Sequence, residues 1–241
     1  MNPNHDLLTH INRAERTDIW EFRTTVTGDP RERIEQIKHV TGTWLAVKDN
    51  PQASPTLCAL AVSALLKNSG YNPILTVNCR DCNRIALQSR LLGAMSLGIT
   101  AILIESGIHP ASGDDPHAKS VYDIDTVQLA GIAVGMSRRH QLLCGNTIDR
   151  ATTLRVGVRL SPFKGNMQLQ ESMLRKYRDT PADFFVLETN DDMARFKKWY
   201  DSVYCKLCLS QIPIFICNSA GVKPEDNAIA SQKGVAGWYY R

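Results

Sequence analysis

The sequence predicts an α/β protein with a parallel sheet, of the (β/α)8 TIM-barrel type. Three observations predict this fold. Short apolar runs alternate with longer amphipathic stretches, eight such runs are present, and the 241 residues approach the length of about 250 typical of such barrels. A doubly wound open sheet is the competing architecture, and the pattern separates the two poorly. No internal repeat or linker interrupts the pattern, so one domain over residues 1–241 is predicted.

The eight predicted strands are mostly rich in β-branched or aromatic residues and are bounded by Gly, Pro, Asn or Asp. They cover residues 19–26, 43–47, 73–79, 101–104, 154–160, 183–187, 212–217 and 235–240. Strands that alternate with helices pair in parallel, because each crossover returns the chain to the same edge of the sheet.

Four stretches between the strands place apolar residues at helical spacing. They cover residues 31–40, 56–68, 85–97 and 193–207, and residues 5–16 could form a further short helix before the first strand. The chain ends directly after the last predicted strand, so we expect the barrel to lack its last helix. Either the N-terminal helix covers that gap, or the open side meets another subunit.

Composition and charge argue against several classes of protein. The net charge is +4, from 28 basic and 24 acidic residues without a basic block, so no nucleic-acid interface is expected. No uncharged apolar run reaches the length of a membrane-spanning helix, and the N-terminus lacks the pattern of a secretory signal. We therefore expect a cytoplasmic protein whose seven cysteines are reduced.

Two CxxC pairs, Cys79/Cys82 and Cys205/Cys208, have a spacing that could close a tetrahedral zinc site. In a barrel, the first pair follows the third strand at the C-terminal face, whereas the second ends a helix at the opposite face. A helix of about 15 residues spans about 22 Å. A shared metal ion is therefore not expected, and free thiols are the prediction.

Glu21 lies inside the first predicted strand, between the large apolar residues Trp20 and Phe22. A carboxylate in this position faces either the lumen of the barrel or an edge. Burial would raise the pKa of Glu21, which suits a proton donor near neutral pH. The alternative is an ion pair in the lumen, for example with Lys48, and the pattern favours neither interpretation.

Polar residues at the C-terminal ends of barrel strands are preferred catalytic positions. Glu188 ends the sixth predicted strand, and Glu105 begins a polar segment, residues 105–110, after the fourth. That segment opens a loop rich in Gly, Asp and Pro. Loops of this length often carry function, although a flexible surface loop is the commoner outcome. His109 and His117 in this loop lack a recognised metal-ligand spacing, and no phosphate-binding glycine motif is present.

The centre of the chain carries an extended motif. Residues 78–94 read NCRDCNRIALQSRLLGA, residues 97–99 read LGI, and residues 119–129 read KSVYDIDTVQL. Shorter motifs are VKDNP at 47–51 and ADFF at 182–185. In this order they resemble the methylenetetrahydrofolate reductase family, with its TCRDxNRxALQSxLLGAxxLGI, KPVFDLDSVQL, VTDNP and GADF segments. The likeness covers roughly residues 19 to 190.

The resemblance implies a (β/α)8 barrel that holds FAD at its C-terminal face. Such enzymes pass a hydride from NAD(P)H through the flavin to a folate one-carbon carrier, and the expected substrate is a folate or pterin. The resemblance implies catalytic roles for Glu21, as the proton donor, and for Glu188, at the position of a substrate-contacting glutamine. The implied cofactor-binding residues are Lys48, Thr76, Ser106, Gly107, Tyr122, Asp123 and Lys176. A homo- or hetero-oligomer is expected.

Three further positions depart from the family pattern. Ile108 replaces an aspartate near flavin and folate, Lys48 replaces a threonine, and Tyr177, beside Lys176, aligns with a lysine that contacts the flavin phosphate. Binding of FAD is therefore expected to be reduced or absent. Two main hypotheses follow: a reductase of this type, or a non-catalytic folate-binding or scaffold subunit. One-carbon transfer without redox chemistry is a third.

Overall fold

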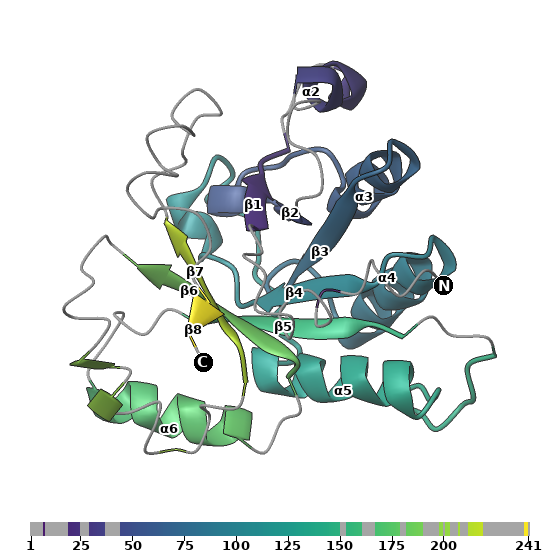
Figure 1. Cartoon of the computed structure of the whole chain (residues 1–241). Coiled ribbons are helices and arrows are strands. Elements are labelled where there is room, and N and C mark those ends of the chain that lie inside the picture. Colours follow the sequence, from purple (N-terminus) through teal and green to yellow (C-terminus); the bar gives the residue numbers. More distant parts are fainter. Residues whose placement is uncertain are drawn as a thin grey trace.

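The computed structural model describes residues 7, 19–24, 29–36, 44–149, 153–160, 167–178, 182–189, 198–199, 201–202, 207, 212–218 and 239–240. Its centre is a sheet whose first seven strands run parallel in chain order (Figure 1). These strands are β1 (Ile19–Phe22), β2 (Trp44–Val47), β3 (Asn72–Asn78), β4 (Ala101–Glu105), β5 (Arg155–Leu160), β6 (Phe184–Thr189) and β7 (Ile214–Asn218). Each overlaps the strand predicted at that place in the sequence.

The sheet is strongly curled. Glu21 Oε1 on β1 lies 2.7 Å from Arg159 Nη2 on β5, whereas four strand spacings on a flat sheet would separate these strands by about 19 Å. One hydrophobic cluster fills the concave side of the sheet. Its members are Leu7, Ile19, Trp44, Ala46, Ile74, Ala101, Leu103, Phe184, Val186 and Phe215. The fold is thus α/β, with a curled parallel sheet of the TIM-barrel type.

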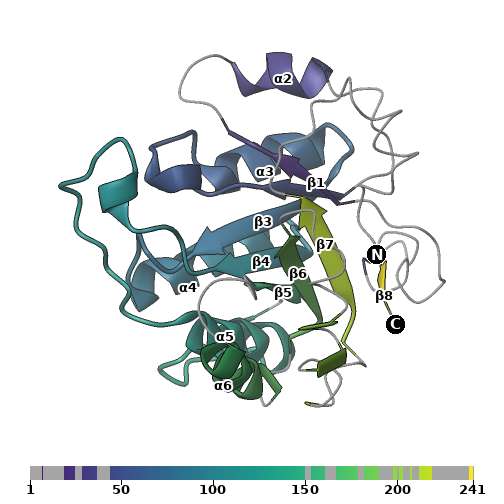
Figure 2. The ribbon, with the colours of Figure 1, turned by 90° about the vertical axis from the view of Figure 1, so that its left-hand side faces the viewer.

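Helices cover the convex side of the sheet (Figure 2). They are α2 (Pro30–Gln36), α3 (Ala59–Asn68), α4 (Arg84–Ser96), α5 (Thr126–Arg138) and α6 (Met167–Arg178), with short 3-10 turns η2 (Pro51–Ala53) and η3 (Pro110–Ser112). A second, larger hydrophobic cluster lies between these helices and the outward side chains of the strands. None of the helices in the described part of the chain is long and apolar enough to cross a bilayer.

The helix predictions are correct for three of the five main helices. Predicted segments 31–40, 56–68 and 85–97 overlap α2, α3 and α4, whereas α5 and α6 were not predicted. Of the predicted N-terminal helix at 5–16, only Leu7 is described, and it is helical and buried. Most of the predicted helix at 193–207 also falls outside the described residues, although Trp199 is helical and buried.

The prediction of eight parallel strands is wrong at the last strand. β8 (Tyr239–Tyr240) pairs with β7 in the antiparallel direction. A parallel strand requires a crossover that returns the chain to its starting edge, whereas an antiparallel strand is entered from the opposite edge. Among the residues that the structure describes, no strand pairing joins β8 to β1.

Candidate functional site

Four charged side chains meet at the C-terminal ends of the strands, on the concave side of the sheet. They are Glu21 from β1, Lys48 directly after β2, Glu105 at the end of β4 and Arg159 near the end of β5. Lys48 Nζ lies 2.9 Å from Glu105 Oε2 and 3.7 Å from Glu21 Oε1. Arg159 lies 2.7 Å from Glu21 through Nη2 and 3.0 Å from Glu105 through Nε. We call this closed set of alternating charges the charge ring.

The alternation of side chains along each strand explains why these four residues meet. Each ring member lies two residues after a position on the concave face: Glu21 follows Ile19, Lys48 follows Ala46, Glu105 follows Leu103, and Arg159 follows Gly157. Residues two apart on a strand point to the same face. The ring therefore forms the next layer above the apolar layer, toward the mouth of the curled sheet.

The ring is largely shielded from water. The exposed fractions of its side chains are 5% for Arg159, 10% for Lys48, 13% for Glu105 and 17% for Glu21. Both carboxylates face two cations. Glu21 thus matches the lumen ion-pair interpretation, with Lys48 as one partner and Arg159 as the closer one.

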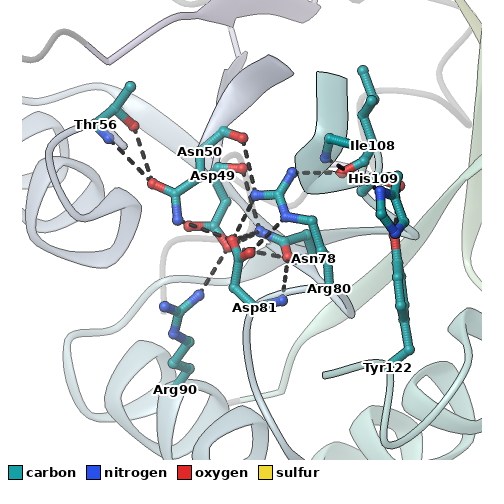
Figure 3. A network of polar contacts seen from close by, with 12 residues as sticks. Asp49, Asn50, Thr56, Asn78, Arg80, Asp81, Arg90, Ile108, His109 and Tyr122 are labelled. Atoms are coloured by element: carbon teal, nitrogen blue, oxygen red, sulfur yellow. Dashed lines mark hydrogen bonds and ion pairs between the residues drawn. The ribbon is translucent and has the colours of Figure 1, made fainter. Parts of the chain in front are cut away.

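A second polar group ties together the segments that follow β2 and β3 (Figure 3). Asn78 Nδ2 donates to Asp49 Oδ2 at 2.7 Å and to Asp81 Oδ2 at 2.9 Å. Arg80 donates to both oxygens of Asp81, at 2.5 and 2.7 Å, and to the backbone oxygen of Asn50 at 3.2 Å. We call these five residues the buried junction.

The two aspartates of the buried junction differ in their electrostatic setting. Burial raises the pKa of Asp49, although the charge of Arg90, 2.8 Å away, opposes the shift. Burial would also raise the pKa of Asp81, but hydrogen bonds from Arg80, Asn50 and Asn78 outweigh it, so that pKa is lowered. Asp81 is therefore a firmly ionised anchor for Arg80.

Arg80 also fixes the loop after β4. Its Nη1 donates to the backbone oxygen of Ile108 at 3.0 Å, while the Ile108 side chain is exposed. Gly107 has φ +85°, and a Cβ at this position would lie 2.9 Å from Arg80 Cβ, so only glycine fits without a shift. Tyr122 OH donates to the Gly107 oxygen at 3.2 Å, and Ser106 is exposed.

The structure brings together some of the predicted site residues and leaves others apart. Glu21 and Lys48 share the charge ring, while Gly107 and Tyr122 share the neighbouring loop. Asp123 lies beside this loop and binds Arg84 through both oxygens, which lowers the pKa of Asp123 to about 2.

Lys176 and Tyr177 lie away from the ring, and the structure leaves the position of the Glu188 side chain open. Lys176 is exposed in the last turn of α6, which leads to the beginning of β6 and hence to the edge of the sheet opposite the mouth. Its neighbour Tyr177 is buried, shares a hydrogen bond with Thr126, and has its pKa raised to about 12 by burial. Glu188 lies on β6 opposite Cys217, and the structure does not describe its side chain.

Thr76 lies on β3, two residues after Ile74 of the concave cluster and therefore on the same face. Its hydroxyl is buried and has no hydrogen-bond partner among the described residues. Thr76, which is predicted to contact the cofactor, thus lies in the apolar layer next to the charge ring with no described hydrogen-bond partner for its hydroxyl.

Cys58, Cys79, Cys82 and Cys144 are free thiols. Cys79 is buried, and burial raises its pKa to about 12, whereas Cys58 is exposed. Cys205 and Cys208 lie outside the described residues, so the second CxxC pair is untested. No group of three or more His, Cys, Asp or Glu side chains that could hold a metal ion occurs among the residues with described positions.

The sequence pattern does not single out Arg159, and it marks Glu105 only as part of a polar segment. A signal for Arg159 was present, because Arg155, Gly157 and Arg159 alternate with three apolar residues on β5. This period of two predicts a strand with one non-apolar face. The ion pairs themselves depend on the curl of the sheet, which no local pattern encodes.

No family model matches this chain, and no curated protein matches it. Solved structures do match. The crystal structure of 2,3-dimethylmalate lyase, a PEP mutase/isocitrate lyase superfamily member, has a TM-score of 0.57 at 15% identity, over 95% of this chain and 77% of that chain. A putative dihydrodipicolinate synthetase from Pseudomonas aeruginosa has a TM-score of 0.51 at 16% identity. The match covers 92% of this chain and 69% of that chain. At these identities the likeness shows the fold alone, which supports a TIM-barrel architecture.

Proposed function

We propose that this chain is an oxidoreductase of the methylenetetrahydrofolate reductase type, acting on a folate or pterin one-carbon carrier. NAD(P)H is the proposed hydride donor. One observation carries the proposal: Glu21, which the sequence resemblance assigns as proton donor, lies at the mouth of a TIM-type sheet within a ring of charged groups. Active sites of TIM barrels occupy this face.

Within this proposal, Lys48 and Arg159 have different roles toward Glu21. Arg159, at 2.7 Å, fixes the carboxylate in place and does not release a proton under ordinary conditions. Lys48, at 3.7 Å from Glu21 and 2.9 Å from Glu105, links the two carboxylates of the ring.

The residues present do not fit FAD well. A diphosphate needs cationic or N–H partners. Lys48 and Arg159 are committed to carboxylates, and Lys176 lies toward the other edge of the sheet. FAD remains part of the expectation from resemblance, but we assign no step to it.

The proposal is tested with the purified full chain and four ligands: tetrahydrofolate, FAD, NADH and NADPH. We expect calorimetry to detect tetrahydrofolate and one nicotinamide cofactor, and an absorbance assay to detect oxidation of that cofactor by methylenetetrahydrofolate. Glu21→Gln should lower turnover while leaving cofactor binding unchanged. Absence of tetrahydrofolate binding, or unchanged turnover in Glu21→Gln, would contradict the proposal.

A second candidate is a non-catalytic folate-binding or scaffold subunit. The two cations beside Glu21 favour it, because they stabilise the carboxylate and oppose proton donation. Size-exclusion chromatography of the chain, alone and co-expressed with its genomic neighbours, distinguishes the candidates. A reductase-active protein that recruits no partner would exclude the scaffold role.

Three related expectations belong to this proposal. We propose that the parallel strands β1–β7 form part of a TIM-type barrel, that the protein works as a homo- or hetero-oligomer, and that it acts in the cytoplasm. The curled parallel sheet supports the first of these.

A further inference from the structure

The two oxygens of Glu105 differ in their contacts with described residues. Lys48 Nζ and Arg159 Nε both approach Oε2 of Glu105, at 2.9 and 3.0 Å. Oε1 of Glu105 accepts no hydrogen bond from any residue in the described part of the chain. A carboxylate oxygen can accept two hydrogen bonds. Because the cations hold the other oxygen, Oε1 is an acceptor with a fixed position.

The charge balance of the ring determines which chemical group fits this acceptor. Two cations and two carboxylates cancel, so the four described side chains of the ring together carry no net charge. A cationic group at Oε1 would approach Lys48 and Arg159, and an anionic group would approach Glu21 and Glu105 itself. A neutral N–H donor avoids both repulsions and still gains a charge-assisted hydrogen bond.

Thr76 provides an independent observation on the same face. Its buried hydroxyl has no partner among the described residues, and its β4 neighbour in the register is Leu103, two residues before Glu105. A buried hydroxyl without a partner is unfavourable. A ligand with a polar group close to Thr76 would supply the missing hydrogen bond.

We propose that Glu105 is the specificity-determining residue of this mouth, and that its Oε1 accepts hydrogen bonds from the N–H edge of a neutral heterocycle. This inference rests on the proposed function, which identifies that edge as the 2-amino group and adjacent ring N–H of a pterin. Thr76, on the neighbouring strand, supplies a second polar contact.

Glu105→Gln is the informative variant, because the ring sets the orientation of the new amide. Lys48 and Arg159 are donors, so the amide oxygen turns toward them. The amide NH2 then occupies the place of Oε1. It cannot accept a hydrogen bond from an N–H group of the ligand. The variant keeps the size of the side chain but exchanges an acceptor for a donor.

The test measures binding of tetrahydrofolate and of its 2-deamino analogue to the unmodified full chain and to Glu105→Gln. The matched control is Glu171→Gln, on the exposed face of α6. We expect the unmodified chain and the control to prefer tetrahydrofolate by about tenfold to a hundredfold, the effect of one charge-assisted hydrogen bond. We expect Glu105→Gln to lose that preference. A purely structural effect would weaken both ligands equally.

The other outcomes separate the two proposals. Equal binding of the two ligands by the unmodified chain overturns the role of Glu105 but leaves the proposed function standing, and this measurement needs no variant to fold. A Glu105→Gln protein that keeps the preference overturns the role as well. Failure of the unmodified chain to bind either ligand overturns both proposals.

Discussion

Gly157 sets the space available on the concave side of the sheet. A Cβ at this position would lie 2.2 Å from Cε2 and Cζ of Phe184, whose ring packs edge-on against Phe215. The glycine on β5 thus lets an aromatic side chain from β6 fill the interior below Arg159. This packing supports the charge ring from beneath.

We predict that Gly157→Ala destabilises the protein by about 1–3 kcal/mol, the usual cost of overpacking an interior. Gly131→Ala is the matched control, because it lies within α5 and a Cβ there meets nothing within 4 Å. The control should be stabilising by up to about 1 kcal/mol, since alanine favours a helix. Urea unfolding measures both, and equal stabilities of the two variants would contradict the packing described.

Two cysteines at the same end of the sheet should differ sharply in reactivity. Cys79 is buried with a pKa of about 12, so only about one thiol in ten thousand is ionised at pH 8. Cys58 is exposed. Iodoacetamide at pH 8 should label Cys58 rapidly and Cys79 only after unfolding, as followed by peptide mass spectrometry. Similar rates in the folded protein would show that Cys79 is accessible.

At the scale of elements, a capping box fixes the first turn of α5. Asp125 accepts from Gln128 N at 2.8 Å, and the Gln128 side chain accepts from Asp125 N at 2.9 Å, forming a capping box. Such a box satisfies two backbone donors that the helix leaves unpaired. α5 then places Leu129 and Ala133 against the convex side of the sheet.

Asp125→Ala should lower the free energy of unfolding by about 1 kcal/mol, because the first turn of α5 loses its cap. Asp125→Asn serves as the control, since an asparagine side chain retains an acceptor. Thermal unfolding followed by circular dichroism measures the difference. If both variants lose the same stability, the charge of Asp125 rather than its cap is responsible.

Local patterns predicted the parallel strands well but the helices less well. β2, β3 and β4 are short, mostly buried runs between turn residues, so composition alone marks them. α5 was missed although Asp125 and Gln128 have the spacing of a capping box. α6 was also missed, although Leu174 and Tyr177 have the spacing of neighbours on one helix face and both are buried.

The site was predicted less completely than the strands. Glu21 and Lys48 were both named, and their ion pair was one of two interpretations. Arg159 was not named, because its contact with Glu21 spans 138 positions and depends on the curl of the sheet. Local periodicity carries no information about contacts of that range. The direction of β8 likewise depends on tertiary pairing.

At the scale of the whole molecule, the charge ring joins the first strand to the fifth across the concave side. Its members are mostly buried, so removing one partner leaves a charge without compensation. The ring is therefore both a brace for the curled sheet and a polar layer on its concave side. The proposed function at the mouth and the stability of the curl involve the same side chains.

We predict that Glu21→Gln and Arg159→Gln each cost about 3 kcal/mol, and that the double variant costs less than their sum. The matched control is the exposed pair Glu171 and Arg175 on α6, whose coupling should be at most about 0.5 kcal/mol. Denaturant unfolding of the four single and two double variants gives both couplings. Equal coupling energies in the two pairs would contradict the claim that the charge ring is shielded from water.

The binding of a reduced pterin at the charge ring is tested most directly by a crystal structure of the full chain with tetrahydrofolate. We predict that the pterin ring lies at the C-terminal ends of β1 and β4, with its 2-amino group within hydrogen-bond distance of Glu105 Oε1. Glu21 should face the same ring. A pterin bound elsewhere, or a charge ring with no ligand at saturating tetrahydrofolate, would contradict the proposed site.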